Sequence, residues 1–336
     1  MYNNKYDQLY KYLKLLRCNY NLEKDNAKRN VLLSDIYQIS SFLEELSYPV
    51  RKLKIKEEKV VIKYYDSYIR LIIDDVLKNK DYLLELLNKV KNELSDKFDL
   101  SNYEYNKQYS LKYIKDIVLN YYNNYNSDYN EIVKQSMEKL IIEKNLKLCL
   151  YGGASALYIE SLNKSIIIVG NYDSSIDLII NLIHEIGHII NCTYERENIY
   201  NNIFDEAFSI SMEFIAKDYL YKQKIISNFD FNNEIVELLN YVSDCINSLA
   251  NLNNIEYINN NINNTIDNLK YFIGYIVAIN YYYLYKEDVK IKEEINKFIT
   301  SNRKLDIIHM LNSYGLNKDA LIKNIKLCLK DKKYNK

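Results

Sequence analysis

The chain has 336 residues, of which 48% are hydrophobic, and 45 basic residues balance 45 acidic ones. This length and apolar content support one large domain or two smaller ones. The zero formal net charge and the lack of a like-charged block exclude a nucleic-acid or membrane-surface partner. Proteins built of strands and turns need glycine and proline as breakers between elements, so six glycines and one proline predict a mostly α-helical protein.

The N-terminus, the apolar stretches and the cysteines indicate the cellular compartment of the protein. The N-terminus has no apolar signal core, and no stretch approaches the 18 apolar residues that a membrane span needs. The cysteines are scattered and form no C-x-x-C pair: Cys18, Cys149, Cys192, Cys245 and Cys328. Reduced thiols of this kind predict a cytoplasmic protein. The sequence does not specify an oligomeric state.

Apolar residues at helical spacing predict four helices in the first part of the chain, at about 1–20, 24–47, 61–76 and 83–90. Each has one apolar stripe and a charged back, which is typical of a bundle. The polar segment 99–107 predicts a boundary, with a helical N-terminal lobe over 1–100 and a second domain over 101–336. The second domain begins with helices expected at 110–125 and 128–144.

The segments 146–159 and 165–169 contain the only predicted strands, expected as one hairpin or small sheet. Ser174, with Asp177 three residues later, predicts the start of the next helix by a capping box. Further helices are expected at about 202–222, 230–250, 264–286, 290–300 and 303–331. The asparagine-rich segment 251–264 is expected to be a loop or a weak helix end.

The helix after Ser174 carries the residues His184-Glu185-Ile186-Gly187-His188. Two histidines four residues apart share one helix face, so both imidazoles could hold one Zn²⁺ at about 2.0–2.1 Å. Glu185 points to the side, where it would act as general base on a water bound to the metal. Two of the chain's three histidines fall in this pattern, and a chance match is improbable on that count. The third, His309, is expected on a helix surface.

A catalytic zinc needs a third protein ligand, and we predict Glu206 on the following helix. Glu213 lies two turns further along nearly the same apolar stripe. It is expected outside the ligand set, accepting a hydrogen bond from a ligand imidazole, or else at the amphipathic edge of its helix. Asp177 is predicted as a second carboxylate that supports the ligands. Asp205 is expected to face solvent or to serve as a reserve partner.

Together these residues resemble the zinc peptidases of the oligoendopeptidase F and thimet oligopeptidase family. The likeness is carried by four blocks: Gly152-Gly153-Ala154-Ser155, Asn171 to His188, Phe204 to Ser209 with Glu213, and Tyr271 to Ala278. It implies a two-lobed, mostly helical zincin-type peptidase with a small sheet beside the metal-binding helix. It also implies one Zn²⁺ per chain, bound by His184, His188 and Glu206. The chain is shorter than typical members, and its spacing between His188 and Glu206 is shorter too.

The resemblance predicts a metalloendopeptidase that cleaves internal bonds of short peptides, with Glu185 as the base. Tyr271 or Tyr275 would donate a hydroxyl hydrogen bond to the oxyanion. The strand residues Ile167, Ile168, Val169 and Gly170 would bind an extended peptide through their backbone edge. Two alternatives remain open: a dedicated processing peptidase for one leader or signalling peptide, or a catalytically weak peptide-binding protein on the same scaffold. The sequence does not specify peptide sequence or length.

Overall fold

The structure is a computed structural model. It describes residues 6–45, 50–51, 53–94, 108–142, 153–170, 172–194, 203–227, 231–252, 255–287, 293, 307–313 and 315–330. The chain forms two compact units, one of Met1–Tyr68 with Ser110–Ile189 and the other of Ile69–Tyr109 with Ile190–Lys336. The predicted boundary near residue 100 lies outside the described residues and stays a prediction.

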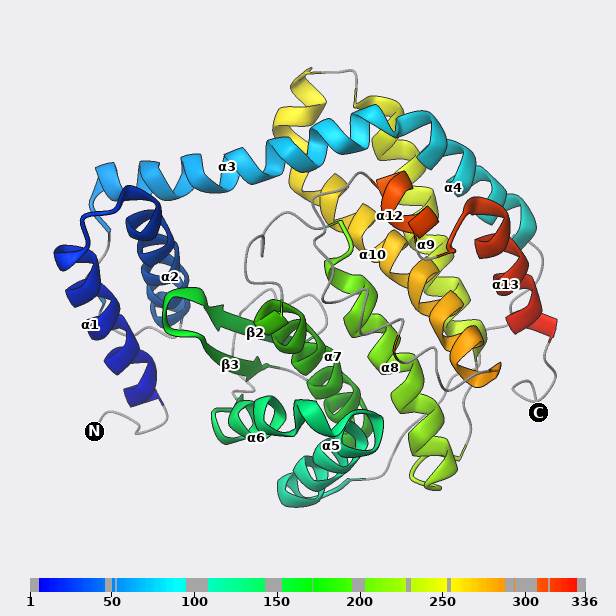
Figure 1. Ribbon diagram of the computed structural model, residues 1–336, viewed down its shortest axis with the longest axis horizontal. Coiled ribbons are helices and arrows are strands. Elements are labelled where there is room, and N and C mark those ends of the chain that lie inside the picture. The colour runs from blue at the N-terminus through cyan, green and yellow to red at the C-terminus, as the bar shows by residue number, and fades with distance from the viewer. Residues whose placement is uncertain are drawn as a thin grey trace. The chain divides into compact units, whose positions relative to one another are not determined.

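The described part of the first unit contains helices and a small sheet (Figure 1). Its elements are α1 (Asp7–Leu22), α2 (Asn26–Glu45), α5 (Leu111–Tyr125), η2 (Ser127–Tyr129), α6 (Asn130–Glu138), β1 (Ile141–Ile142), β2 (Ala154–Ile159), η3 (Glu160–Leu162), β3 (Lys164–Val169) and α7 (Ser175–Tyr194). The helices α3 (Ile55–Lys78) and α7 contribute residues to both units, since the second unit begins at Ile190. The hairpin predicted between the segments 146–159 and 165–169 is confirmed, because β2 and β3 pair antiparallel.

The second unit is helical in its described part (Figure 1). It consists of α4 (Lys80–Leu94), α8 (Asp205–Lys222), α9 (Phe231–Asn251), α10 (Ile255–Glu287), α12 (Ile307–Ser313) and α13 (Lys318–Lys330). The long helix α10 packs against α8, α9 and α13. The mostly α-helical fold predicted from composition is therefore confirmed. None of the described helices is long and apolar enough to cross a membrane.

The sheet differs from the expectation in having a third strand. The helix predicted over 128–144 ends at Glu138, and Ile141 and Ile142 pair parallel with Ile168 and Val169 of β3. Ile141 is buried in the core that α1 and α2 share with the sheet. Both isoleucines are β-branched and favour a pleated surface, so pairing with β3 prevails over helical continuation.

The strand order β1-β3-β2 places β3 at the centre of the sheet. Ile166 and Ile168 face the core shared with α1 and α2, and the alternate residues Ile167 and Val169 are buried as well. β2 pairs along the whole of β3, and β1 covers its last two residues, so Ile168 and Val169 have strand neighbours on both sides. That residues 167–170 bind an extended peptide stays a prediction. In the described sheet, β1 and β2 are the two edge strands.

Two further expectations concern helices. The asparagine-rich segment, expected as a loop or a weak helix end, is a helix end from 255 onward, because α10 begins at Ile255. Asparagine is only a weak helix breaker, and α10 continues into the buried residues Thr265 and Ile266. The single helix predicted over 303–331 is two helices, separated where Gly315 adopts φ +70°. Apart from Glu293, the helix predicted at 290–300 lies outside the described residues.

A buried carboxylate ties α2 to the connection between β2 and β3. Asp35 is 1% exposed and accepts hydrogen bonds from the backbone N–H groups of Glu160 at 3.2 Å and Ser161 at 2.9 Å. The Ser161 hydroxyl also donates to it. Burial raises the pKa of Asp35 to about 6, although these donors favour the charged form.

This raised pKa predicts a defined dependence of stability on pH. The folded chain binds the Asp35 proton more tightly than the unfolded chain, whose Asp titrates near 3.9, so this contribution to stability is present below about pH 4 and is lost as pH rises to about 6. We expect the free energy of unfolding of the wild type, minus that of Asp35→Asn, to fall by roughly 1–3 kcal/mol across this window. Urea unfolding of both proteins at several pH values measures it, and a constant difference would contradict the assignment.

Candidate metal centre

The helix that carries the histidine pair begins with the predicted capping box. The Asp177 carboxylate accepts from the backbone N–H of Ser174 at 2.9 Å and from its hydroxyl at 2.8 Å, and the Asp177 N–H donates to Ser174 Oγ at 3.2 Å. These reciprocal bonds satisfy donors at the helix start that have no partner within the helix. The predicted start of α7 is therefore confirmed, and these contacts make Asp177 a capping residue. Its predicted support of the ligands stays a prediction.

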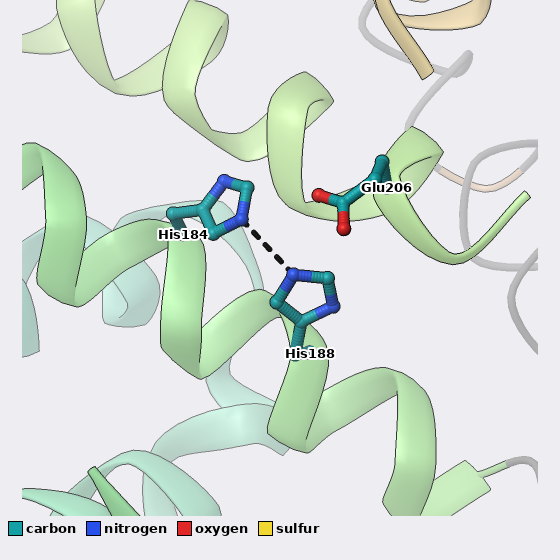
Figure 2. Close-up of side chains that lie close together, drawn as sticks. All are labelled: His184, His188 and Glu206. Atoms are coloured by element: carbon teal, nitrogen blue, oxygen red, sulfur yellow. Dashed lines mark hydrogen bonds between the residues drawn. The ribbon is translucent and has the colours of Figure 1, made fainter. Parts of the chain in front are cut away.

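His184 and His188 lie on one face of α7, as their spacing predicts. Their Nε2 atoms are 3.0 Å apart, and the ring centroids are separated by 4.7 Å (Figure 2). The opposite side of the helix is held by buried aliphatic residues, among them Leu182, Ile183 and Ile186. Both imidazoles remain partly buried. The apolar packing thus fixes the helix rotation that presents the two ring nitrogens together.

Glu185 follows His184 and is 8% exposed. One residue further along an α-helix turns the side chain by about 100°, so Glu185 leaves the ligand face while staying beside it. On α5, the buried Tyr122 hydroxyl donates to the Ile183 carbonyl at 2.6 Å. This bond anchors the helical turn directly before His184. Sequence analysis missed Tyr122, because nothing distinguishes it among 36 tyrosines.

Glu206 lies in the first turn of α8. Behind it α8 is buried on most of its surface, including Ala207, Phe208 and Ile210. Asp205 is not solvent-facing, since its carboxylate is 21% exposed and receives a hydrogen bond from Lys270 of α10 at 2.9 Å. Burial alone would lower the pKa of Lys270, but Asp205, Glu206 and Asp267 raise it, so this lysine stays charged.

One ligand atom from each of His184, His188 and Glu206 lies within 4.8 Å of the other two, and Figure 2 shows the Glu206 carboxylate facing the two rings. Four tetrahedral ligands at about 2.0–2.1 Å from zinc stand roughly 3.3 Å apart, close to the histidine separation. Two imidazoles and one carboxylate are also the donor set of many catalytic zinc sites. The residues therefore fit zinc.

Glu213, predicted to accept a hydrogen bond from a ligand imidazole, forms an ion pair with a lysine. Its carboxylate lies 3.9 Å from Lys217 Nζ one turn further along α8. Lys217 also pairs with Glu234 of α9. Burial raises the pKa of Glu234 even though Lys217 opposes this. The bond predicted between Glu213 and an imidazole stays a prediction, and Lys217 is a partner that sequence analysis did not identify.

The two tyrosines predicted to act on the oxyanion lie on α10. The Tyr271 ring stacks on Tyr241 of α9, with centroids 5.0 Å apart, and Tyr275 meets Tyr241 at 5.8 Å and Phe214 at 6.2 Å. Burial and nearby carboxylates raise the pKa of Tyr275 well above its usual value, and they raise the pKa of Tyr241 to about 12. The Tyr275 and Tyr241 phenols therefore stay protonated and able to donate a hydrogen bond. Whether Tyr271 or Tyr275 would contact a substrate stays a prediction. His309 is exposed on α12, as expected.

The fold is similar to that of a solved structure named as a peptidase. An X-ray structure named oligoendopeptidase F matches 89% of this chain and 64% of its own, at 12% identity and a TM-score of 0.51. An oligoendopeptidase F from Bacillus anthracis str. Ames (90% and 63% covered, 12%, TM-score 0.47) and PZ peptidase A with an inhibitor (90% and 66%, 12%, 0.47) are also similar. This chain thus spans less than two thirds of each. No protein-family model and no curated protein matches its sequence.

Proposed function

We propose that this protein is a zinc-dependent metallopeptidase that hydrolyses internal bonds of short peptides. The observation that carries the proposal is the convergence of His184, His188 and Glu206 within 4.8 Å. The buried Glu185 stands beside this ligand set on the same helix. A structural zinc site has no use for a carboxylate in that position, whereas a hydrolytic site needs a base there. The likeness of the fold to oligoendopeptidase F supports the peptidase class.

When bound, zinc would lower the pKa of a coordinated water to about 7 and polarise the scissile carbonyl. Glu185 would take a proton from the attacking water and deliver it to the leaving amine. Its burial strengthens this role, because charge interactions are larger where solvent is excluded. Tyr271 or Tyr275 would donate a hydrogen bond to the developing oxyanion, and a protonated phenol is the state that this requires.

The outer edge of β2 is a further surface that we propose for the peptide backbone, beside the predicted residues of β3. The Gly170 N–H donates to the Gly153 carbonyl at 2.7 Å, which marks this pair as hydrogen-bonded. Alternation along an antiparallel ladder then turns the peptide groups of Ala154, Ala156 and Tyr158 away from β3. An extended peptide would pair with these groups as an added strand.

Removal of the metal tests the proposal directly. Against a library of internally quenched peptides, the purified protein should release fluorescence, and a chelator should abolish the signal because the ligands would then lack zinc. Addition of Zn²⁺ in slight excess over the chelator should restore the rate. A matched sample given Ca²⁺ should stay inactive, since calcium prefers six to eight oxygen ligands. Cleavage that is unaffected by chelation would contradict a metallopeptidase.

Two narrower alternatives predict other outcomes in the same assay. A dedicated processing peptidase would leave most of the library intact and cleave few sequences, in a chelator-sensitive way. A catalytically weak peptide-binding protein would hold stoichiometric zinc and cleave none. Metal content by mass spectrometry, measured on the same preparation, separates silence with zinc from silence caused by an empty site.

A further inference from the structure

Gly274 lies where α10 comes closest to Glu206. A Cβ atom built on Gly274 would stand 2.7 Å from Glu206 Cβ and 2.8 Å from Ile210 Cδ1, and 3.2 Å from the backbone carbonyl carbon of Glu206. Separations below 3.0 Å are not tolerated between carbon atoms. Glycine inside a helix costs about 1 kcal/mol relative to alanine. Here the missing side chain lets the α10 backbone approach Glu206, the residue that we assign as the third ligand.

The start of α8 depends on α10 in a second way. Its N-cap residue, Phe204, makes no side-chain hydrogen bond to the first turn. Lys270, one turn before Gly274 on α10, instead donates to Asp205, the neighbour of Glu206. This pair is about four-fifths buried on both sides, which limits screening by solvent. Two residues of α10 that lie one turn apart, Lys270 and Gly274, therefore contact Asp205 and Glu206 respectively.

We propose that Gly274 and Lys270 are positioning residues that set where the Glu206 carboxylate stands relative to the metal. The inference rests on the proposed function, because it takes Glu206 as a zinc ligand. Ligand geometry must hold to fractions of an ångström. A side chain at position 274 would push the Glu206 Cβ, which has no freedom to move independently of the α8 backbone. Lys270 would fix the first turn of α8 through its ion pair with Asp205.

The test is the zinc affinity of Gly274→Ala, measured by competition with a chromophoric chelator. We expect the zinc Kd to rise about 10- to 100-fold, the range seen when support of a ligand is lost. The visible spectrum of the Co²⁺-loaded variant should change as well, because the coordination geometry changes. Neither readout requires the protein to be active. Unchanged Kd and spectrum would overturn the inference.

A matched control separates positioning from general destabilisation. Val277 is fully buried on the same helix, and Val277→Ala creates a cavity without crowding Glu206. It should lower the thermal midpoint and leave the zinc Kd within about twofold, as expected for a site without direct coupling. The double variant Gly274→Ala/Ile210→Val removes the Cδ1 conflict but keeps the one with Glu206 Cβ. Its zinc affinity should stay weak, and recovery to the wild-type Kd would contradict positioning through Glu206.

Lys270→Met provides a second measurement if Gly274→Ala fails to fold. Methionine keeps most of the apolar stem and removes the ion pair with Asp205, so we expect a several-fold rise in zinc Kd; an unchanged Kd would overturn the role of Lys270. The Glu206→Ala variant, measured in parallel, separates a failure of the positioning proposal from a failure of the assignment of Glu206 as a ligand. Loss of zinc there with wild-type affinity in Gly274→Ala and Lys270→Met would refute positioning alone. Retention of zinc in Glu206→Ala would refute the ligand assignment and the inference with it.

Discussion

Glu185→Gln should retain one zinc per chain and lose peptide hydrolysis by about 10²- to 10⁴-fold, the usual contribution of a general base. Glutamine has nearly the same shape and keeps a carbonyl oxygen, so it preserves packing at this buried position. It accepts no proton at neutral pH, so it removes only the chemical role. Zinc content by mass spectrometry and initial rates on a quenched peptide are measured together.

Glu138→Gln is a suitable control, because Glu138 is exposed at the end of α6. It carries the same chemical change within the same unit and should leave rate and zinc content unchanged. Peptide cleavage by Glu185→Gln at the wild-type rate would show that another group acts as the base. Loss of zinc from Glu185→Gln would instead show that Glu185 helps to hold the metal.

Glu206→Ala should lose stoichiometric zinc and, as a consequence, all metal-dependent hydrolysis. A ligand is removed outright, so the rise in zinc Kd should exceed the roughly 100-fold upper range for residues that only support ligands. Dialysis against a fixed free zinc concentration, followed by metal analysis, measures this. Circular dichroism verifies that the helical content is retained.

Glu213→Ala is the matched control for the same helix. Glu213 pairs with Lys217, and if it also accepts a bond from a ligand imidazole its loss should raise the zinc Kd by about 10- to 100-fold. If Glu213 serves only the ion pair, zinc binding should not change. Either result lies clearly below the effect expected for Glu206→Ala, and an equal effect of the two variants would contradict the distinction between ligand and support.

Local patterns in the sequence determined much of this fold. The shortage of glycine and proline indicated helices, and helices form the bulk of both units. Reciprocal hydrogen bonds between Ser174 and Asp177 are a contact across three residues, so the start of α7 was readable directly. The spacing of His184 and His188 likewise sufficed to place their rings together, since helix geometry alone relates residues four apart.

Other features were decided by contacts between distant segments. Ile141 and Ile142 continue a helical pattern, yet they form a strand because β3 offers backbone partners more than 20 residues away. For the same reason β3 is the central strand of the described sheet, with β1 and β2 at its edges. The residues 255–264 are the first turns of the long helix α10, which packs against α8 and α9. Propensity is outweighed wherever such packing is available.

The candidate metal centre shows the same division. By itself the sequence determined two imidazoles and an adjacent carboxylate on one helix, because their geometry is set by a single periodicity. Only the tertiary structure decided that Lys270 pairs with Asp205 and that Gly274 admits α10 to within contact of Glu206, the residue that the sequence predicts as the third ligand. These relations join residues up to about 70 positions apart in the chain. Side-chain burial and helix packing set such distances, and no local spacing encodes them.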